Sequence, residues 1–293
     1  MKKQLSYITR LLLLSGVAVI MSTSCMFLPQ KEVEEEPSVS TEEKVNDDGT
    51  KVLTKDGLTL VWQDEFDYTG VPDVNKWKYQ TGANGWGNNE LQNYLNNTTE
   101  AKTAVVEDGV LKIKAFKENN KWVSARLNSK QSWKYGFIEG RLKITDRKGA
   151  WPAFWMMPQN SVYGNWPKSG EIDIMENAPS TCGNHKVFST LHAEGHYGGN
   201  GKSIGGKVYG DELSSEWHTF AVKWEENKIS CYYDDVLKGS YENDRTTANW
   251  PYNEDFYIIL NLAIGGDLGG PLNDVNTLGG EAEFLIDYIR VYQ

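Results

Sequence analysis

The chain from about residue 56 to residue 293 consists of short runs in which apolar and polar residues alternate. Alternation with a period of two predicts half-buried β-strands, and no long amphipathic helical pattern interrupts the runs. Turn-forming pairs such as Asp108-Gly109, Asp234-Asp235 and Gly265-Gly266 separate them. The clearest runs cover residues 110–115, 136–144, 187–192, 219–224, 228–233, 256–262 and 284–292. This spacing predicts one large all-β domain, a sandwich of two antiparallel sheets.

One predicted strand, Glu171-Ile172-Asp173-Ile174-Met175-Glu176, carries three carboxylates among apolar residues. Side chains along a strand alternate between its two faces, so Glu171 and Asp173 share one face. Strict alternation would place Met175 next on that face and turn Glu176 away. A β-bulge at Met175 restores the phase and brings Glu176 alongside the other two acids.

The spacing of the two glutamates suits the cleavage of a glycosidic bond. Glu171 and Glu176 are four effective strand steps apart, which separates their backbones by roughly 13 Å. Side chains that lean toward each other leave roughly 5 Å between the carboxyl groups, the separation found in retaining glycosidases. Three neighbouring carboxylates cannot all ionise at low cost, so we expect at least one to keep its proton near neutral pH. A solvated acidic strand face and a Ca²⁺-binding acidic cluster are the alternatives.

The chain is also rich in aromatic residues, with 11 tryptophans and 15 tyrosines, more than the core of a sandwich needs. Trp151, Trp155 and Trp166 lie shortly before the acidic strand, and Trp86 and Tyr94 lie farther upstream. Indole rings pack on the flat C–H faces of pyranose sugars, so the cluster indicates a carbohydrate-binding surface. For any single tryptophan, burial in the core is an equally good interpretation.

Residues 1–24 have the pattern of a secretory signal peptide. Three cations precede the apolar run 11–20, which is too short to span a membrane permanently. Small residues then precede Cys25, as in the lipidation site of bacterial lipoproteins, and we expect Cys25 to become the lipidated N-terminus. Ordinary cleavage that leaves a free cysteine is the alternative.

Residues 25–55 are rich in acids and poor in apolar side chains. They are expected to form a flexible acidic tether ahead of a folded domain at 56–293. Acids soon after a lipidated cysteine resemble the surface-export signal of bacterial lipoproteins, and a plain solvated linker is the alternative. The expected location is therefore the outer membrane, with the protein exposed at the cell surface.

The net charge of −10 argues against nucleic-acid binding, which needs a basic face, and favours neutral ligands. After Cys25, only Cys182 and Cys231 remain. They could pair outside the cytoplasm, but two cysteines do not decide this.

Ordered motifs along residues 58–293 resemble glycoside hydrolase family 16, in particular its bacterial laminarinases and β-1,3(1,4)-glucanases. The motifs are WQDEF at 62–66, GWGNNELQ at 85–92, YG at 135–136 with Glu139 and Arg141, WPAFWM at 151–156, WP at 166–167, GEIDIME at 170–176, LH at 191–192, WHTF at 217–220, NLAIGG at 261–266 and DYIRVY at 287–292. The resemblance implies that the domain at 56–293 is catalytic. It further implies a β-jelly roll with a substrate cleft across its concave sheet.

The same resemblance implies roles for individual residues. Glu171 would be the nucleophile, Glu176 the general acid and base, and Asp173 a hydrogen-bond partner of the nucleophile. The other positions expected in or near the cleft are Asn89, Glu90, Arg141, Trp151, Trp155, Trp166, His192 and Asn261. A structural Ca²⁺ on the opposite face would use Glu65, Gly109 and Asp287, and catalysis would need no cofactor. His192 and His218 could instead be structural histidines, and for His218 we expect a structural role.

The sequence thus predicts a lipid-anchored, retaining endo-β-glucanase that cleaves β-1,3 or mixed β-1,3/β-1,4 glucans. Its expected partners are β-glucan chains and, through the anchor, a membrane; we expect a monomer and no nucleic acid. A retaining hydrolase of agarose-type galactan and a transglycosylase are alternatives within the enzyme class. A glycan-binding surface lipoprotein without catalysis is an alternative of another class, and the presence of all three acids argues against it.

Overall fold

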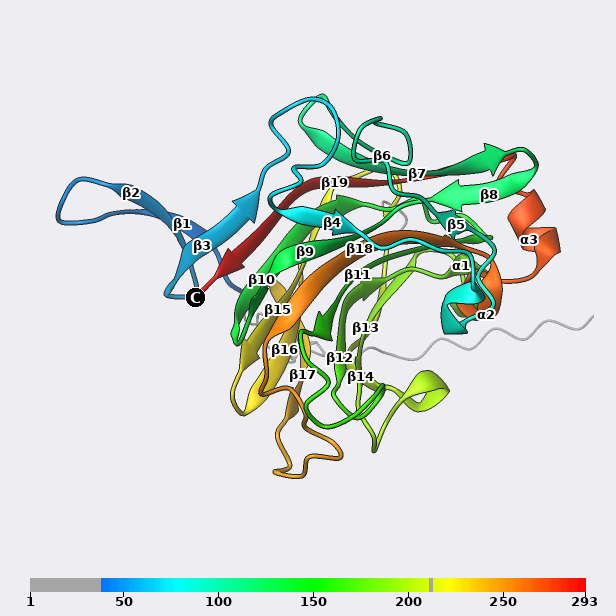
Figure 1. Cartoon of the computed structure of the whole chain (residues 1–293). Coiled ribbons are helices and arrows are strands. Elements are labelled where there is room, and N and C mark those ends of the chain that lie inside the picture. The colour runs from blue at the N-terminus through cyan, green and yellow to red at the C-terminus, as the bar shows by residue number, and fades with distance from the viewer. Residues whose placement is uncertain (1–37, 211–212) are drawn as a thin grey trace, which may run out of the picture. The chain divides into compact units, whose positions relative to one another are not determined.

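The structure, a computed structural model, describes residues 38–210 and 213–293. Within these ranges the chain forms the predicted sandwich of two β-sheets (Figure 1). The helical segments are short: α1 (Pro179–Cys182), α2 (Gly266–Gly269), α3 (Leu272–Asn276) and the 3-10 turns η1 (Gly85–Gly87) and η2 (Gly198–Asn200).

The larger sheet has 12 strands in the described residues and contains the N-terminal and C-terminal strands. Its main path is β1 (Thr41–Val45), β2 (Lys51–Lys55), β3 (Leu58–Asp64), β19 (Glu281–Tyr292), β10 (Gly136–Lys143), β15 (His218–Glu225), β16 (Lys228–Tyr233) and β17 (Val236–Glu242). A branch from β19 adds β7 (Val110–Glu118), β6 (Ala104–Glu107), β8 (Lys121–Ser124) and β5 (Asn93–Tyr94). The pairs are antiparallel except β5 with β8.

The smaller sheet has seven strands and carries the acidic strand near its middle. Its order is β14 (Lys202–Tyr209), β13 (Lys186–His192), β12 (Glu171–Glu176), β11 (Ala150–Pro158), β18 (Phe256–Ile264), β9 (Arg126–Trp133) and β4 (Trp77–Tyr79). β12 therefore pairs with β11 on one side and β13 on the other (Figure 1).

The core lies between the two sheets. On the smaller sheet, Phe154, Met156, Ile172 and Leu260 point into it and are completely buried. Burial of one such side chain stabilises a fold by roughly 1.5–3 kcal/mol. The alternate residues of the same strands face the other way, so one face of this sheet holds the fold together and the opposite face is available for a site.

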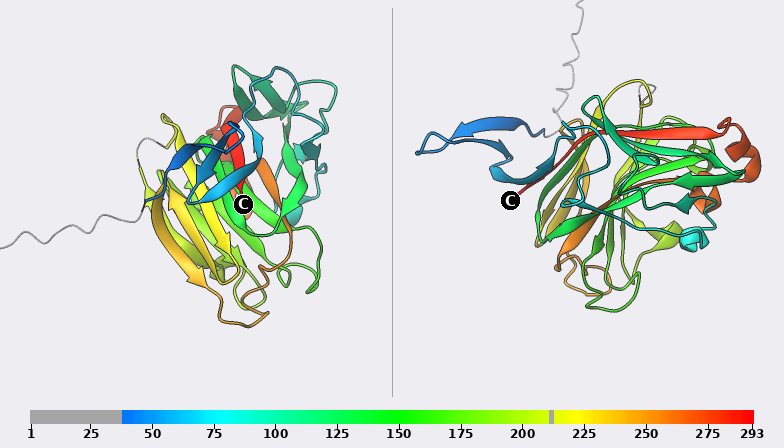
Figure 2. Two further views of the ribbon diagram at one scale, coloured as in Figure 1. Left: turned by 90° about the vertical axis from the view of Figure 1, so that its left-hand side faces the viewer. Right: turned by 45° about the horizontal axis from the view of Figure 1, so that its top comes forward.

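The N-terminal boundary of the folded domain differs from the sequence prediction. Residues 41–55, assigned to a flexible tether, form the hairpin β1–β2, which extends away from the sandwich (Figure 2). Lys55 at the end of the hairpin is 1% exposed and ion-paired with Glu139. Acidic composition could not indicate this contact, because the partner lies 84 residues away. The expected signal peptide, Cys25 and the part of the expected tether up to residue 37 lie outside the described residues.

Cys182 and Cys231 are both free thiols, so the pairing left open by the sequence does not occur. Across the part of the chain that the structure describes, no helix has the length and apolar character needed to cross a membrane.

Candidate active site

The acidic strand contains a β-bulge, as the sequence predicts, but on the β11 side the extra residue is Ile174 and not Met175. Along β11, Phe154 faces Met175 and Trp155 faces Asp173, so Ile174 has no counterpart there. An extra residue of this kind is the signature of a β-bulge.

The pairing with β13 shows the same irregularity. Ile174 and Met175 together oppose a single residue, Ser189. Both apolar side chains join the core. Because two consecutive residues point inward, Glu176 returns to the face that carries Glu171.

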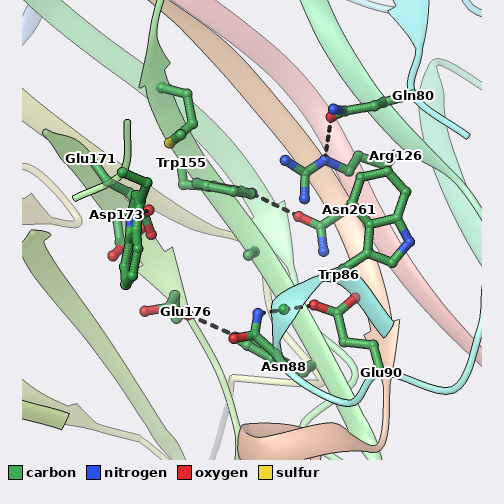
Figure 3. A pocket seen from close by; sticks show the side chains of 15 residues that line it. Gln80, Trp86, Asn88, Glu90, Arg126, Trp155, Glu171, Asp173, Glu176 and Asn261 are labelled. Atoms are coloured by element: carbon green, nitrogen blue, oxygen red, sulfur yellow. Dashed lines mark hydrogen bonds between the residues drawn. The ribbon is translucent and has the colours of Figure 1, made fainter. Parts of the chain in front are cut away.

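A pocket of about 370 Å³ lies on this face of the smaller sheet. β9, β11, β12 and β18 supply most of its walls, and the segment around η1 closes one side. Figure 3 shows the three acids of β12 on one side, opposite Arg126, Asn261 and Glu90. The lining residues are Gln80, Trp86, Gly87, Asn88, Glu90, Arg126, Trp151, Ala153, Trp155, Met157, Trp166, Glu171, Asp173, Glu176 and Asn261.

A tryptophan orients each of the two glutamates. The indole Nε1 of Trp166 donates a hydrogen bond to Glu171 Oε2 at 2.6 Å. The indole Nε1 of Trp151 donates to Glu176 Oε1 at 3.0 Å. Since Trp166 is 48% exposed, it can offer a ring face to a ligand while its N–H holds the carboxylate.

Asp173 lies beside Glu171 and hydrogen-bonds it. Asp173 Oδ2 is 3.0 Å from His192 Nε2, a close contact whose alignment is not that of a hydrogen bond. Each of Glu171, Asp173 and His192 offers one ligand atom, and these three atoms lie within 4.8 Å of one another. The three groups could therefore together hold a metal ion.

Burial raises the pKa of all three carboxyl groups. It raises the pKa of Glu171 to about 8, with the charge of Asp173 adding to the effect and His192 and Trp166 opposing it. It raises the pKa of Glu176 to about 7, against the hydrogen bond from Trp151. The pKa of Asp173 lies well above its usual range, because of burial and then the charge of Glu176. The cluster therefore keeps protons near neutral pH.

Arg126 forms the opposite wall and was missed by the sequence analysis. Its guanidinium carbon lies 4.8 Å from the ring centroid of Trp86 and 4.6 Å from that of Trp155. Its Nε donates to Gln80 Oε1 at 2.7 Å. Burial lowers the pKa of Arg126, and Glu90 opposes that effect. No motif marks this residue, because only the pairing of β9 with β18 brings it to the pocket.

A hydrogen-bond chain links the aromatic wall to the floor of the pocket. Trp155 Nε1 donates to Asn261 Oδ1 at 2.7 Å, and Asn261 Nδ2 donates to the hydroxyl of Tyr94 at 3.0 Å. Glu90 Oε2 accepts from Gln92 Nε2 at 2.6 Å. These bonds fix the orientation of the side chains that a ligand would meet.

Most of the residues expected in the cleft come together in the pocket. In addition to the three acids, the structure brings Glu90, Trp151, Trp155, Trp166 and Asn261 to its lining. His192 reaches the site through Asp173. Asn89, which was expected in or near the cleft, does not line the pocket. Its side chain is exposed and donates to Asp267 Oδ1 at 2.8 Å.

Arg141 was also expected in or near the cleft, and it does not line the pocket either. It belongs to β10 of the larger sheet, where Arg141 Nη1 donates to Asp287 Oδ2 at 2.6 Å and its guanidinium packs against Trp217. A motif position identifies a strand but not which sheet or face the strand joins, and here the strand belongs to the sheet that does not line the pocket.

The proposed calcium ligands also lie on the larger sheet or its turns. Both oxygens of Glu65 accept from Arg290, at 2.7 and 2.8 Å, and Asp287 accepts from Arg141. Gly109 occupies the turn between β6 and β7 with φ of 74°. Because guanidinium groups hold the two carboxylates, this donor set, as it lies, does not fit a calcium ion.

His218 lies on β15 of the larger sheet, with its Nδ1 2.8 Å from Asp234 Oδ2. This residue lines no part of the pocket, in keeping with the structural role expected for it.

A two-sheet β-sandwich whose bulged strand presents paired glutamates to a tryptophan-lined pocket has the architecture of a glycoside hydrolase. The family model of glycosyl hydrolases family 16 matches residues 88–289, and the chain belongs to this family.

Several similar proteins are glucanases or laminarinases. A β-glucanase from Rhodothermus marinus is 38% identical over 247 residues, which cover 80% of this chain and 85% of the relative. The structure of the laminarinase from Rhodothermus marinus superimposes with a TM-score of 0.74 at 35% identity, covering 80% of this chain and 96% of that one. A LamA variant from Z. galactanivorans, solved with laminaritriose and laminaritetraose, superimposes with a TM-score of 0.67 at 36% identity, covering 80% and 98%. The sandwich therefore matches the family's jelly-roll structures, and the chain is a family 16 endo-β-glucanase homologue.

Proposed function

We propose that the protein is a retaining endo-β-glucanase that hydrolyses β-1,3 or mixed β-1,3/β-1,4 glucans. The observation that carries the proposal is the bulged strand, which brings Glu171 and Glu176 into one pocket beside Asp173. The relatives described above, which include a laminarinase and a protein solved with laminari-oligosaccharides, support β-glucan as the substrate class.

In the first step, the carboxylate of Glu171 attacks the anomeric carbon while Glu176 gives its proton to the glycosidic oxygen. The bond between that carbon and oxygen breaks, and a glycosyl ester with Glu171 forms. In the second step, Glu176 takes a proton from water, the water oxygen attacks the same carbon, and Glu171 leaves as a carboxylate. Two inversions restore the original configuration.

Two neighbours of Glu171, Trp166 and His192, favour the ionised state that this role requires, although burial raises the pKa of Glu171 to about 8. Trp166 donates to its carboxylate, and His192 lowers its pKa. Asp173 acts against this state, because its charge and its hydrogen bond with Glu171 both raise the pKa of Glu171. The raised pKa of Glu176, about 7, suits a general acid that is protonated below neutral pH.

We also propose that the protein is an outer-membrane lipoprotein anchored through Cys25 and exposed at the cell surface, with the catalytic domain behind a tether. The signal-like residues 1–24 and the acids that follow Cys25 support this placement. A tethered endo-enzyme would release oligosaccharides close to the cell that takes them up.

Kinetics and product stereochemistry test the enzymatic proposal. Glu171→Ala should reduce laminarin hydrolysis to background while laminarin binding persists, and Glu176→Ala should lower it by about 10²–10⁴-fold. Exposed Glu242 on β17 provides a control, since Glu242→Ala should retain full activity. Wild-type-like turnover of Glu171→Ala, or an α-anomer as the first product by NMR, would refute the mechanism.

Substrate panels separate the alternatives. Laminarin, mixed-linkage glucan, agarose and xyloglucan are compared side by side, with the released oligosaccharides analysed. Cleavage of agarose alone would favour the galactanase, and products longer than the substrate would favour the transglycosylase.

A further inference from the structure

The bulge that sets the direction of Glu176 is held by a side chain from the neighbouring strand. Ser189 of β13 is the single residue opposite Ile174 and Met175. Its Oγ donates a hydrogen bond of 2.6 Å to the carbonyl oxygen of Ile174, and Ser189 is 6% exposed. An unmet buried polar group costs about 1–3 kcal/mol, so this bond favours the bulged conformation of the strand.

The Ser189 hydroxyl is itself oriented from the other sheet. Its Oγ lies 2.9 Å from the sulfur of Cys231, which belongs to β16 across the core. A serine hydroxyl has one proton, and Ser189 gives it to Ile174, so the Cys231 thiol is the donor in this pair. Burial raises the pKa of Cys231 to about 11, and the thiol therefore keeps its proton at neutral pH.

Close packing leaves the two side chains little freedom. A Cβ atom on Gly205 of β14 would lie 3.1 Å from the Cys231 sulfur. The cavity beside Ser189 and Cys231 measures about 10 Å³, the lower limit for one water molecule.

We propose that Ser189, oriented by Cys231, is a positioning residue that holds the bulge and so aims Glu176 into the pocket. The inference rests on the proposed function, in which Glu176 is the acid and base. Glu171 precedes the bulge and pairs with His192 in the regular ladder, whereas Glu176 follows the bulge. Loss of the Ser189 hydroxyl therefore displaces Glu176 more than Glu171.

The test compares substrates that differ in their need for an acid. Laminarin has a sugar alcohol as leaving group, which must be protonated, whereas a dinitrophenyl β-laminaribioside needs no proton for its first step. For Ser189→Ala we expect kcat on laminarin to fall about tenfold, part of the 10²–10⁴-fold that general acid–base catalysis supplies. Release of dinitrophenolate in the first turnover should stay near the wild-type rate. Azide, which attacks the glycosyl-enzyme without a base, should raise the steady-state turnover of the aryl substrate.

Matched variants separate positioning from a general loss of stability. Ser124 is fully buried and donates to the Leu262 carbonyl at 2.7 Å, so Ser124→Ala removes the same kind of bond elsewhere. It should show no leaving-group selectivity. Cys231→Ser keeps a donor and should resemble the wild type, while Cys231→Ala should show the Ser189→Ala signature more weakly. If Ser189→Ala does not fold, the comparison of Cys231→Ala with Cys231→Ser tests the positioning role by the same measurements.

Equal losses on both substrates, or the same selectivity in Ser124→Ala, would overturn the inference. Glu176→Ala, measured in parallel, identifies which claim has failed. If it shows leaving-group selectivity and azide rescue but the Ser189 and Cys231 variants do not, the positioning role alone is wrong. If Glu176→Ala lacks both signatures, the proposed role of Glu176 is wrong and the inference falls with it.

Discussion

At the scale of single residues, Asp173 and Glu176 are buried and Glu171 is partly buried, and the charged forms of all three acids are costly in the folded protein. Their pKa values rise chiefly because burial removes water from the carboxylates. A chain selected for stability alone would place apolar residues at such positions, so this cluster trades stability for reactivity.

This trade predicts a pH-dependent effect of Glu176→Gln on stability. Glu176 has a folded-state pKa of about 7, above its ordinary value of 4.5, so the folded protein binds this proton more tightly than the unfolded chain does. The stability that Glu176 adds by holding this proton is fully present below about pH 4.5 and is lost as pH rises through 7. A neutral glutamine has no such loss, so the variant's Tm advantage should grow by a few degrees from pH 5 to pH 8.5. Thermal unfolding followed by circular dichroism measures it, with exposed Glu242→Gln as control.

A constant difference in Tm between Glu176→Gln and the wild type across this range would contradict the raised pKa of Glu176.

The sequence could identify the three acids because they lie within six residues of one strand, where alternation and one bulge decide their directions. Arg126 could not be found this way, since β9 contributes it from 45 residues before Glu171 and only sheet pairing brings it to the pocket. Arg141 is the opposite case, because the sequence analysis wrongly expected it in the cleft. Its motif belongs to β10, and β10 joins the sheet that does not line the pocket.

At the scale of elements, the hairpin β1–β2 shows how composition can mislead. Its acidic segment looks like a linker, and the five residues of β1 are indeed exposed. The hairpin is nonetheless attached to the sheet through β3, and Lys55 inserts between Glu139 and Asp235. Glu139 also accepts a hydrogen bond of 3.0 Å from Tyr288.

This attachment predicts that Lys55→Met is strongly destabilising. The substitution leaves the completely buried carboxylate of Glu139 without its cation, which should lower the free energy of unfolding by about 3–5 kcal/mol. Lys55→Met with Glu139→Gln should recover much of the loss, because no buried charge remains. Lys51, which pairs with Glu43 at the exposed end of the hairpin, gives the control, and Lys51→Met should cost less than about 1 kcal/mol. Urea unfolding measures all three, and equal effects at positions 51 and 55 would contradict the role of burial.

At the scale of the whole molecule, the two faces of the smaller sheet have separate tasks. One face packs into the core and the other carries the pocket, so the polar groups that line the pocket sit on a rigid sheet without disturbing the packing behind it. The link from Cys231 through Ser189 to the bulge is the exception, since it connects the larger sheet to the acidic strand β12.

The proposed anchor predicts where the whole protein resides. Cys25→Ala removes the sulfur that would be lipidated, and the protein should move from the membrane fraction to the soluble fraction. Wild-type protein should be digested by protease added to intact cells if it is surface-exposed. Fractionation with immunoblotting measures both, and unchanged membrane association of Cys25→Ala would count against lipidation.

The sequence alone determined the strands, the sandwich class, the acidic triad with its bulge and the family, because these depend on local alternation and on ordered motifs. The tertiary structure decided which motif residues meet in the pocket, that the cysteines remain unpaired and that the N-terminal hairpin joins the fold. It also revealed the Ser189 and Cys231 support behind the bulge. The physical reason is that alternation assigns a side chain to one face of its own strand, whereas the partner on that face is chosen by sheet order and packing between residues far apart in the chain.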